Sequence, residues 1–374
     1  MHVDYLSRSL AKLVPLTVHA FGSDRPQGDG PRVVSYSPWE AVNGGAPYAA
    51  ALATMSVDLA FAAGVEGASL VHSHTWYANL GGHLGKLVHG IPHVATTHSL
   101  EPLRPWKAEQ LGGGYALSAF CERTAVENAD AVIAVSRAMR DDVVDCYPAV
   151  DPERLHVILN GIDSEEYRPD PDTDVLERHG VRAGEPYAIF VGRITRQKGV
   201  THLLDAAASI DSAAQLVLCA GAPDTPELGA EVRAKVESLQ RERGNVFWIE
   251  EMLPRPDVIQ LLSHAAVFVC PSVYEPLGIV NLEAMACETA VVATAVGGIP
   301  EVVVDGETGY LVPFDGGPND PEGFAAEIAE RVNAVLRDPA LARRLGDAGR
   351  RRAVAEFSWD EIAEQTEALY RTLV

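Results

Sequence analysis

The sequence predicts an α/β protein made of two doubly wound domains with parallel sheets, which face each other across a cleft. Its 374 residues are too many for one hydrophobic core, and two domains of roughly 150–200 residues each are the natural division. Short apolar runs alternate with segments of helical spacing in both halves, which is the order of βαβ units. The acidic, proline-rich stretch DSEEYRPDPDTD at residues 163–174 is typical of a linker between them.

The first half opens on HVDYLSRSLAKL, an amphipathic segment that predicts a helix with no strand before it. A doubly wound domain usually opens with a strand and a ligand-binding loop, so we expect this one to lack its first strand and Gly-rich loop. Five compact apolar runs then predict buried parallel strands, with helices between them such as 48–63 and 115–128. These runs are Leu16–Gly22, Ala68–His74, Pro92–His98, Asp130–Ser136 and Leu155–Gly161.

The second half repeats the pattern with the runs YAIFVGRI, AQLVLCAG, NVFWIE, AVFVCPS, AVVAT and GYLVP. We therefore expect an N-terminal domain over residues 1–165 and a C-terminal domain over residues 175–355. A last helix at residues 356–374 is expected to pack back on the N-terminal domain. Ligands of such sheets bind beyond the carboxyl ends of the strands, so the cleft is the expected site.

Charge and cysteine content exclude several classes of partner. The chain has 52 Asp and Glu against 30 Lys and Arg, a formal charge of -22, which repels nucleic acid and anionic lipid. The five Cys form no CxxC pair, which favours free thiols in a reducing compartment. No run approaches the roughly 18 apolar residues of a membrane span, and the N-terminus lacks the order of a signal peptide. We expect a cytoplasmic protein without nucleic-acid or membrane partners.

A basic cluster stands out in this acidic chain. VGRITRQKGV follows a predicted strand, precedes a predicted helix, and contains Arg193, Arg196 and Lys198. Cations beside a helix N-terminus favour a clamp for a diphosphate, although a solvated basic turn is the plainer alternative. The loop is neither a Walker loop nor a GxGxxG fingerprint, which argues against an NTPase and a dehydrogenase.

A second strand–loop–helix unit, CPSVYEPLGIVNLEAMA, carries carboxylates at both ends of an apolar run. Its turn places the backbone N–H groups of residues 277–280 at a helix N-terminus, ready for an anion. Glu275 and Glu283 would repel that anion, so they are better suited to accept hydrogen bonds from sugar and ribose hydroxyls. The alternative is one Glu that caps the helix and one on the surface.

The histidines and the acidic triplet are weaker candidates. His72 and His74 share one face of a strand, but no third ligand follows at a spacing that favours zinc. His98, at the end of the next strand, is expected to donate a hydrogen bond to substrate, whereas a core role for His72 is as plausible as any other. Asp170-x-Asp172-x-Asp174 sits among prolines and is interpreted as solvated charge. The loop LGGGY either approaches a ligand or is mobile.

The two loops resemble those of the retaining GT-B glycosyltransferases of family 4. EPLGIVNLE is similar to their E-x7-E motif and GRITRQKG to their phosphate-binding loop, and the resemblance covers essentially the whole chain. HSHTWYANLGGHLGKL, THSLEPLRPWKAEQLGGGYALS, CAGAPDTPE and EEMLPRP resemble the actinobacterial glycogen synthase and α-maltose-1-phosphate synthase branch. The resemblance implies two Rossmann-like domains of the GT-B fold, an N-terminal acceptor domain and a C-terminal nucleotide-sugar domain.

It also implies glucosyl transfer with retention, from ADP-glucose or UDP-glucose, to glucose 1-phosphate or to glycogen. Arg193 and Lys198 would hold the diphosphate, Glu275 the sugar hydroxyls and Glu283 the ribose, with His98 beside the reacting carbon. Retention is expected by front-face attack without a protein nucleophile. The donor site would include Leu277, Gly278, Ile279 and Val280, and the acceptor site Arg104, Lys107 and Tyr115.

The chain departs from the family pattern at its shortened start, at EAMACETAVV, and at Thr75 of HSHTW, where Asp is frequent. Arg104 and Lys107 suit the phosphate of glucose 1-phosphate, although pairing with Glu101 and Glu109 is the plainer alternative. No metal or other cofactor is expected, and a homodimer is compatible with the sequence. Two other functions stay open: a GT-B enzyme of another reaction or acceptor, and a silent nucleotide-sugar-binding protein.

Overall fold

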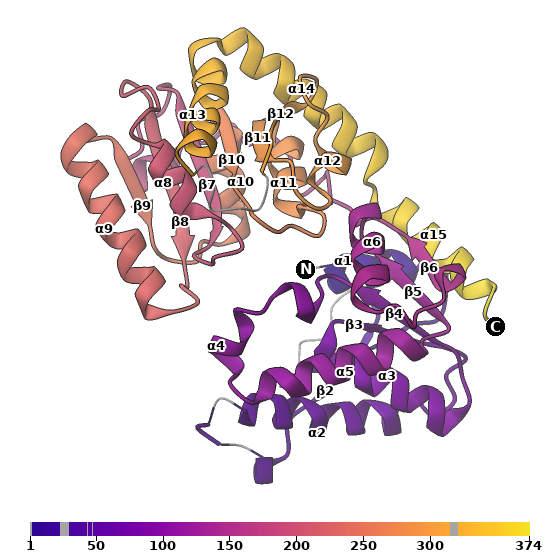
Figure 1. Ribbon diagram of the computed structural model, residues 1–374. Coiled ribbons are helices and arrows are strands. Elements are labelled where there is room, and N and C mark those ends of the chain that lie inside the picture. Colours follow the sequence, from indigo (N-terminus) through magenta and orange to yellow (C-terminus); the bar gives the residue numbers. More distant parts are fainter. Residues whose placement is uncertain (1, 23–29, 43, 47, 315–320) are drawn as a thin grey trace. The chain divides into compact units, whose positions relative to one another are not determined.

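The chain folds into two compact units, Met1–Gly161 with Trp359–Val374, and Ile162–Ser358. They are called unit 1 and unit 2 below. The computed structural model describes the chain except for residues 1, 23–29, 43, 47 and 315–320 (Figure 1). No helix among the described residues is long and apolar enough to cross a lipid bilayer.

Unit 2 is built on a six-stranded parallel sheet with the order β12-β11-β10-β7-β8-β9. Its strands are β7 (Tyr187–Arg193), β8 (Gln215–Gly221), β9 (Val246–Ile249), β10 (Val267–Cys270), β11 (Ala290–Thr294) and β12 (Gly309–Val312). All six coincide with the apolar runs that predicted them. Every residue of β8, β10 and β11 is buried, as expected of parallel strands covered on both faces.

Helices cover both faces of this sheet (Figure 1). One face carries α8, α9 and α13, whose apolar side chains share one core with the strands. The helices α10, α11, α12 and α14 belong to the other side, where α11 packs against α10 and α14. The bounds are α7 (Asp174–Arg178), α8 (Val200–Ala206), α9 (Pro226–Arg243), α10 (Arg255–Ser263), α11 (Ile279–Ala286), α12 (Ile299–Val302), α13 (Pro321–Arg337) and α14 (Pro339–Glu356).

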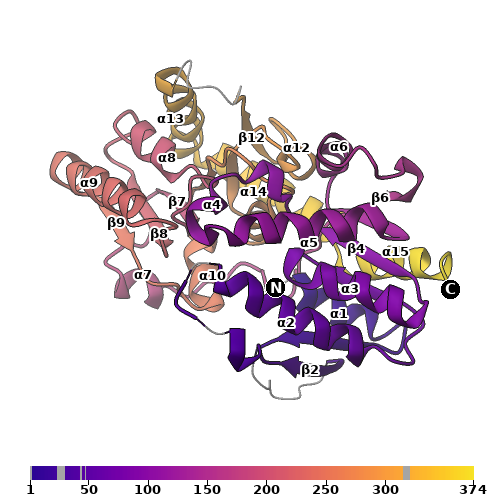
Figure 2. The same cartoon turned by 60° about the horizontal axis from the view of Figure 1, so that its bottom comes forward.

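Unit 1 contains a four-stranded parallel sheet with the order β3-β4-β5-β6. These strands are β3 (Val71–His74), β4 (His93–Thr97), β5 (Ala131–Ala134) and β6 (Leu155–Val157). The helices α2, α3 and α5 lie side by side (Figures 1 and 2). The helices of unit 1 are α1 (His2–Leu10), α2 (Ala49–Gly64), α3 (Trp76–His89), α4 (Lys107–Leu111), α5 (Gly114–Asn128), α6 (Arg137–Cys146) and α15 (Trp359–Arg371), with the short 3-10 turns η1 (Glu40–Val42), η2 (Glu101–Leu103) and η3 (Pro152–Arg154).

The run at residues 16–22 forms a strand, but not the buried one that its composition predicted. It becomes β1 (Thr17–Phe21), which pairs in parallel with β2 (Arg32–Tyr36) in a separate two-stranded sheet. Both strands are only half-buried. The sequence analysis missed β2 because RVVSY opens with a charge and is too short to show a clear period.

The last helix belongs to unit 1. Tyr5, Leu6 and Leu10 of α1 share a buried cluster with Trp359 and other apolar residues of α15. Asp360 at the start of α15 accepts hydrogen bonds from Ser9 Oγ and Lys12 Nζ, each at 2.7 Å. The chain therefore leaves unit 1 at Gly161 and returns to it at Trp359.

A buried carboxyl joins two helices of unit 1. Asp58 of α2 is fully buried; its Oδ1 accepts a hydrogen bond from the Gly81 N–H of α3 at 3.0 Å, and its Oδ2 has no hydrogen-bond partner among the described residues. The helices approach closely, since a Cβ on Gly81 would lie 2.9 Å from Asp58 Oδ1. Burial raises the pKa of Asp58 to about 8, so the folded protein keeps this carboxyl protonated at neutral pH.

Asp58→Asn should make the stability of the protein less dependent on pH. The native pKa of Asp58 is raised, so its contribution is greatest at acid pH and falls as pH rises toward 8, because the unfolded chain releases the proton first. We expect the unfolding free energy of the variant minus that of the parent to rise by roughly 1.4 kcal/mol per pH unit between pH 5 and pH 8. Urea unfolding followed by circular dichroism at several pH values measures this. A constant difference between the two proteins would contradict it.

Candidate functional site

The two loops singled out in the sequence lie against each other at the carboxyl ends of β7 and β10. Gly199 precedes α8 in the left-handed region, with φ 62°, and a Cβ there would lie 2.0 Å from the carbonyl oxygen of Pro271. The N–H of Val273 donates to the carbonyl of Gln197 at 2.9 Å. Only Gly allows this approach, so the glycine of GRITRQKG brings both motifs into one site.

A buried ion pair joins these loops. Lys198 Nζ lies 2.6 Å from Glu275 Oε2, and their side chains are 26% and 9% exposed. Ser272 Oγ donates to the same carboxylate oxygen at 3.2 Å. Burial by itself lowers the pKa of Lys198, but the attraction of Glu275 outweighs it and holds that pKa above its usual value. The Lys198 ammonium group is therefore held in an ion pair with Glu275.

Arg193 lies at the end of β7 and is more exposed than Lys198. Its Nη2 pairs with Asp224 Oδ1 at 2.7 Å, and its side chain is 55% exposed. Asp224 follows β8, so the sheet brings it to the same edge. Arg196 of the same loop is exposed. Lys198 and Arg193 thus both face the carboxyl edge of the sheet, each with an acidic partner that a bound anion would have to displace.

The helix after the second loop begins as the sequence predicted. Gly278, with φ 95°, immediately precedes α11, and Leu277 is buried. Ile279 and Val280 form the first turn of α11 and are partly exposed. The first backbone N–H groups of a helix have no partner within it and attract anions, so this turn suits a phosphate beside Lys198.

Glu283, one turn further, is not on the surface. It is 7% exposed, and Tyr167 Oη donates a hydrogen bond to its Oε1 at 3.1 Å. Burial raises the pKa of Glu283 to about 7, although the hydrogen bond from Tyr167 and the charges of Lys198 and Arg255 each lower it. A carboxylate that is buried and half-ionised near neutral pH is an acceptor whose strength changes with pH.

Tyr167 comes from the stretch that the sequence analysis interpreted as a linker. The part around Tyr167 is held firmly to unit 2: its side chain is 2% exposed, and Arg350 Nη1 donates to its carbonyl at 3.2 Å. Arg255 pairs with Glu166 at 2.8 Å. Asp172 and Asp174 are exposed, and Asp174 pairs with Arg178 at 3.0 Å. The acidic composition of the stretch concealed one buried aromatic residue.

Three histidines of unit 1 lie in β3 or directly after β4: His72, His74 and His98. His74 Nδ1 and His98 Nε2 lie 3.1 Å apart. Both nitrogens of His72 are engaged, Nδ1 with Tyr370 Oη at 2.5 Å and Nε2 with Thr96 Oγ1 at 2.6 Å, which supports the core role for His72. Burial lowers the pKa of His98 to about 4 and of His72 to about 3. His98 is therefore neutral at pH 7 and has one ring N–H to donate.

A third histidine, His2, lies beside His74 and His98, and no pattern in the sequence indicates it. Its ring lies 4.4 Å from that of His98 and 5.3 Å from that of His74, between centroids. One nitrogen from each of the three imidazoles can be chosen so that all lie within 4.8 Å of one another. No spacing rule could have joined a residue of the first helix to the ends of two later strands.

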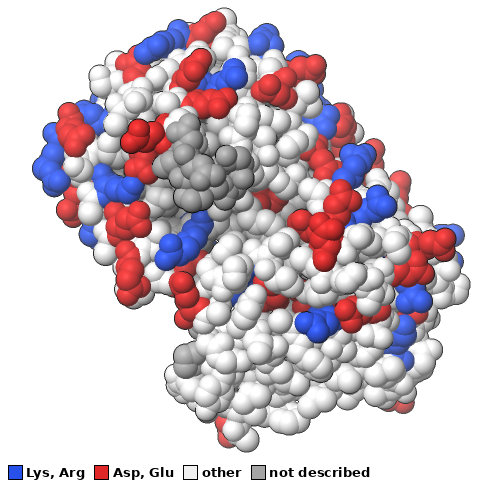
Figure 3. Space-filling model, viewed as in Figure 1, with Lys and Arg blue, Asp and Glu red and all other residues white. Residues whose placement is uncertain are grey.

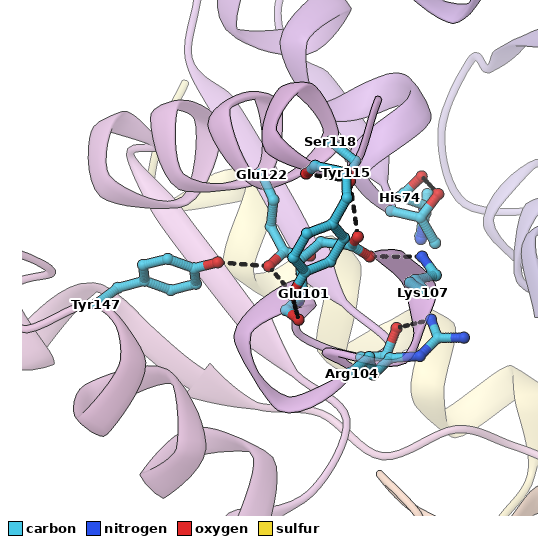
Figure 4. A network of polar contacts seen from close by, with 10 residues as sticks. His74, Glu101, Arg104, Lys107, Tyr115, Ser118, Glu122 and Tyr147 are labelled. Carbon is cyan, nitrogen blue, oxygen red and sulfur yellow. Dashed lines mark hydrogen bonds and ion pairs between the residues drawn. The ribbon is translucent and has the colours of Figure 1, made fainter. Parts of the chain in front are cut away.

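Figure 4 shows the candidate acceptor residues of unit 1, which centre on the buried Glu101. Lys107 Nζ lies 2.5 Å from Glu101 Oε1, and their side chains are 13% and 1% exposed. Ser118 Oγ donates to Glu101 Oε2 at 2.8 Å, and Tyr115 Oη donates to the Glu101 carbonyl at 2.6 Å. The sequence left open that Arg104 and Lys107 pair with Glu101 and Glu109. The pair between Lys107 and Glu101 is present.

Arg104 remains the more available cation of this segment. Its Nη1 donates to Ser99 Oγ at 3.0 Å, and its Nε is buried, without a hydrogen-bond partner among the described residues. A second buried acid, Glu122, supports the segment from α5: it accepts from the Glu101 N–H at 2.7 Å and from Tyr147 Oη at 2.5 Å. Burial raises the pKa of Glu122 to about 7.

Charge is distributed unevenly over the surface. On the face shown in Figure 3, Lys and Arg alternate with Asp and Glu over unit 2, whereas much of the surface of unit 1 is uncharged. The composition of α2 explains part of this, because its sole charged residue, Asp58, is buried. On this face, the Lys and Arg side chains therefore form no continuous basic surface.

Comparison with known proteins identifies the family. Residues 1–166 match "Glycosyltransferase Family 4" and residues 172–352 match "Glycosyl transferases group 1". The chain is 56% identical to alpha-maltose-1-phosphate synthase of Mycolicibacterium smegmatis over 99% of its own length and 94% of that protein. It is a family 4 glycosyltransferase. The resemblance read from the two loops is confirmed.

Further comparisons agree. This glycosyltransferase is 54% identical to alpha-maltose-1-phosphate synthase of Mycobacterium tuberculosis, again over 99% of its own length and 94% of the relative. Its structure is similar to that of sucrose-phosphate synthase from Thermosynechococcus elongatus, with a TM-score of 0.77, 29% identity, and 99% and 92% of the two chains covered. The predicted GT-B fold, with parallel sheets in α/β units, is thus confirmed, and the protein is an enzyme that transfers glycosyl groups.

Removing one partner of the ion pair in this glycosyltransferase should cost more stability than removing both. In Lys198→Met the buried Glu275 loses its partner, which should lower the free energy of unfolding by about 3 kcal/mol, the low end for a buried pair because the Lys198 side chain is 26% exposed. The double variant Lys198→Met/Glu275→Gln leaves no buried charge and should recover most of that loss. Denaturant unfolding of the four proteins of this cycle gives the coupling. Additive effects would show that the two groups do not interact in solution.

Proposed function

We propose that this glycosyltransferase transfers glucose from ADP-glucose, or UDP-glucose, to glucose 1-phosphate with retention, forming an α-1,4 linkage and giving maltose 1-phosphate. Extension of glycogen or another α-glucan from the same donor is the alternative acceptor reaction. The observation that carries the proposal is the meeting of Lys198, Glu275 and the first turn of α11 at the edge of one sheet. The 56%-identical relative is an alpha-maltose-1-phosphate synthase, which supports the choice of product.

The donor half of the proposal assigns each group by its charge. Lys198 and Arg193 would bind the diphosphate, whose departure needs positive charge more than it needs a protonated acid. The N–H groups at Leu277–Val280 would add donors. Glu275 would turn from Lys198 toward hydroxyls of the glucose once the phosphate competes for the ammonium group. Glu283 would accept hydrogen bonds from the ribose hydroxyls.

On the side of unit 1, His98 would donate its ring N–H to the transferred glucose. Its lowered pKa supports this, because a neutral imidazole does not repel the positive charge that develops on a sugar ring. We propose front-face attack, in which the leaving phosphate takes the acceptor proton and no protein nucleophile is used. Neither a metal ion nor another cofactor has a role in this scheme.

The acceptor half rests on Arg104. Lys107 is paired with Glu101, whereas the Arg104 guanidinium donates to the neutral hydroxyl of Ser99, and a guanidinium can bind a phosphate through two parallel hydrogen bonds. Tyr115 and Lys107 would act indirectly, through Glu101, by fixing the segment that carries Arg104. A neutral glucan needs no such cation, which favours a sugar phosphate.

Loss of either donor cation should abolish most of the activity. We expect Arg193→Ala and Lys198→Ala each to lower kcat/KM for ADP-glucose by about a hundredfold, since each removes a charge-assisted contact of nearly 3 kcal/mol. Arg196→Ala is the matched control, because this exposed cation of the same loop is not assigned to the clamp, and it should stay within threefold of the parent. Activity near the parent level in both test variants would refute the clamp.

Donor affinity should fall in mild acid. Ionised Glu283 is the better acceptor, and protonation as pH falls through about 7 removes that strength. We expect the Kd for ADP-glucose, whose diphosphate does not titrate in this range, to rise about tenfold from pH 8 to pH 6. Glu283→Gln should flatten the profile. Tyr167→Phe should move it to higher pH, because the hydrogen bond that lowers the pKa of Glu283 is lost. Calorimetric titration across pH decides this; an unchanged profile in Glu283→Gln would exclude Glu283 as its cause.

Arg104→Ala should affect one acceptor only. We expect kcat/KM for glucose 1-phosphate to fall at least tenfold, mainly through KM, while the value for glycogen stays within twofold. Arg140→Ala, which removes an exposed cation of α6, is the control. Product analysis with both acceptors at matched donor concentration gives the ratio. Preference of the parent for glycogen, or an unchanged ratio in Arg104→Ala, would overturn the choice of acceptor.

A further inference from the structure

Three imidazoles from three separate elements of unit 1 converge. His2 is the first residue of α1, His74 is the last residue of β3, and His98 follows β4. One nitrogen of each can be chosen so that all lie within 4.8 Å of one another, and each residue is half-buried. The pair His74 Nδ1 and His98 Nε2 is already only 3.1 Å apart. This is the kind of geometry in which imidazoles share a metal ion.

The distances fit a small tetrahedral ion. Zinc–nitrogen bonds are about 2.0–2.1 Å, so two nitrogens on one tetrahedral ion lie roughly 3.3–3.4 Å apart. His74 and His98 meet that spacing almost without movement. His2 must close by somewhat more than 1 Å, and a change of its side-chain rotamer at the start of a helix can supply this.

The chemistry of the ligand set selects the class of ion. Imidazole binds Zn²⁺, Cu²⁺, Ni²⁺ and Co²⁺, whereas Ca²⁺ and Mg²⁺ require oxygen ligands, and no carboxylate belongs to this group. His72, the nearest further histidine, is excluded as a ligand because its two nitrogens are hydrogen-bonded to Tyr370 and Thr96.

We propose that His2, His74 and His98 form a binding site for one divalent transition-metal ion of the Zn²⁺ type, with an open fourth position, and that its occupation inhibits transfer. Three histidines with a vacant coordination position are the ligand set of many zinc enzymes. Inhibition follows because an ion on His98 takes the ring away from the sugar and places positive charge there. The binding part stands on the geometry alone, whereas the inhibitory part rests on the proposed function.

Cobalt titration of the full chain tests the binding part without any substrate. The protein is first freed of metal with EDTA and dialysed, then titrated with Co²⁺ while the visible d–d absorption is followed. We expect one Co²⁺ per chain with the intense spectrum of tetrahedral coordination, displaced by one equivalent of Zn²⁺. His2→Asn and His74→Asn should each weaken binding at least tenfold. His72→Asn is the matched control and should bind as the parent does.

Circular dichroism melting of each variant verifies that it is folded. His2→Asn, in the first turn of α1, is the variant expected to disturb folding least. The proposal is overturned if the folded parent gives no tetrahedral spectrum, if folded His2→Asn binds as tightly as the parent, or if His72→Asn loses the ion. A weak octahedral spectrum that persists in every variant would equally overturn it, since it marks adventitious surface binding.

The inhibitory part needs the assay with ADP-glucose and glucose 1-phosphate. EDTA-treated protein should be fully active, and one equivalent of Zn²⁺ should lower the rate at least tenfold in the parent and in His72→Asn, with recovery on adding EDTA. Full activity with Zn²⁺ bound would refute the inhibition. A parent with no transfer activity would refute the proposed function, and the cobalt titration would still decide the metal site.

Discussion

The ion pair between Lys198 and Glu275 is the constraint on which the donor site depends. It joins the loops after β7 and β10, and the close approach of Gly199 to Pro271 allows them to meet. Taking two charges out of water is costly, so the pair persists because each neutralises the other and Ser272 adds a hydrogen bond. A bound diphosphate would compete for the ammonium group and release the carboxylate. The resting contact therefore prepares both groups for their proposed roles.

Unit 1 also contains a buried pair of a lysine and a glutamate, Lys107 and Glu101, but this pair stabilises a segment of the fold. Glu101 is more deeply buried than Glu275, and it takes Lys107, Ser118 and the neighbouring backbone into one network that Glu122 and Tyr147 extend (Figure 4). This network uses its lysine entirely for structure. Arg104 of the same segment donates instead to the neutral hydroxyl of Ser99, so Arg104, rather than Lys107, is the candidate contact for an acceptor phosphate.

Local pattern predicted the features that depend on local sequence. The strands of unit 2 are continuous apolar runs, and the loops after β7 and β10 carry charge and glycine where an anion site needs them. Features fixed by contacts far apart in sequence escaped prediction. Tyr167 reaches Glu283 from an acidic stretch, Asp224 reaches Arg193 from the next strand, and His2 joins His74 through the packing of α1. Lys107 pairs with Glu101 because both side chains are buried, and the local sequence does not show that burial.

Burial acts on the two kinds of titrating group in opposite directions, and this separates the two halves of the reaction. It lowers the pKa of His98 to about 4, so the imidazole stays neutral throughout the neutral range. It raises the pKa of Glu283 to about 7, into the middle of that range. Both shifts disfavour charge. The consequence is that a sugar contact made by His98 would be insensitive to pH near neutrality, whereas a ribose contact made by Glu283 would weaken as the medium acidifies. Any loss of transfer activity in mild acid should therefore come from weaker donor binding, and not from a change in the contact between His98 and the sugar.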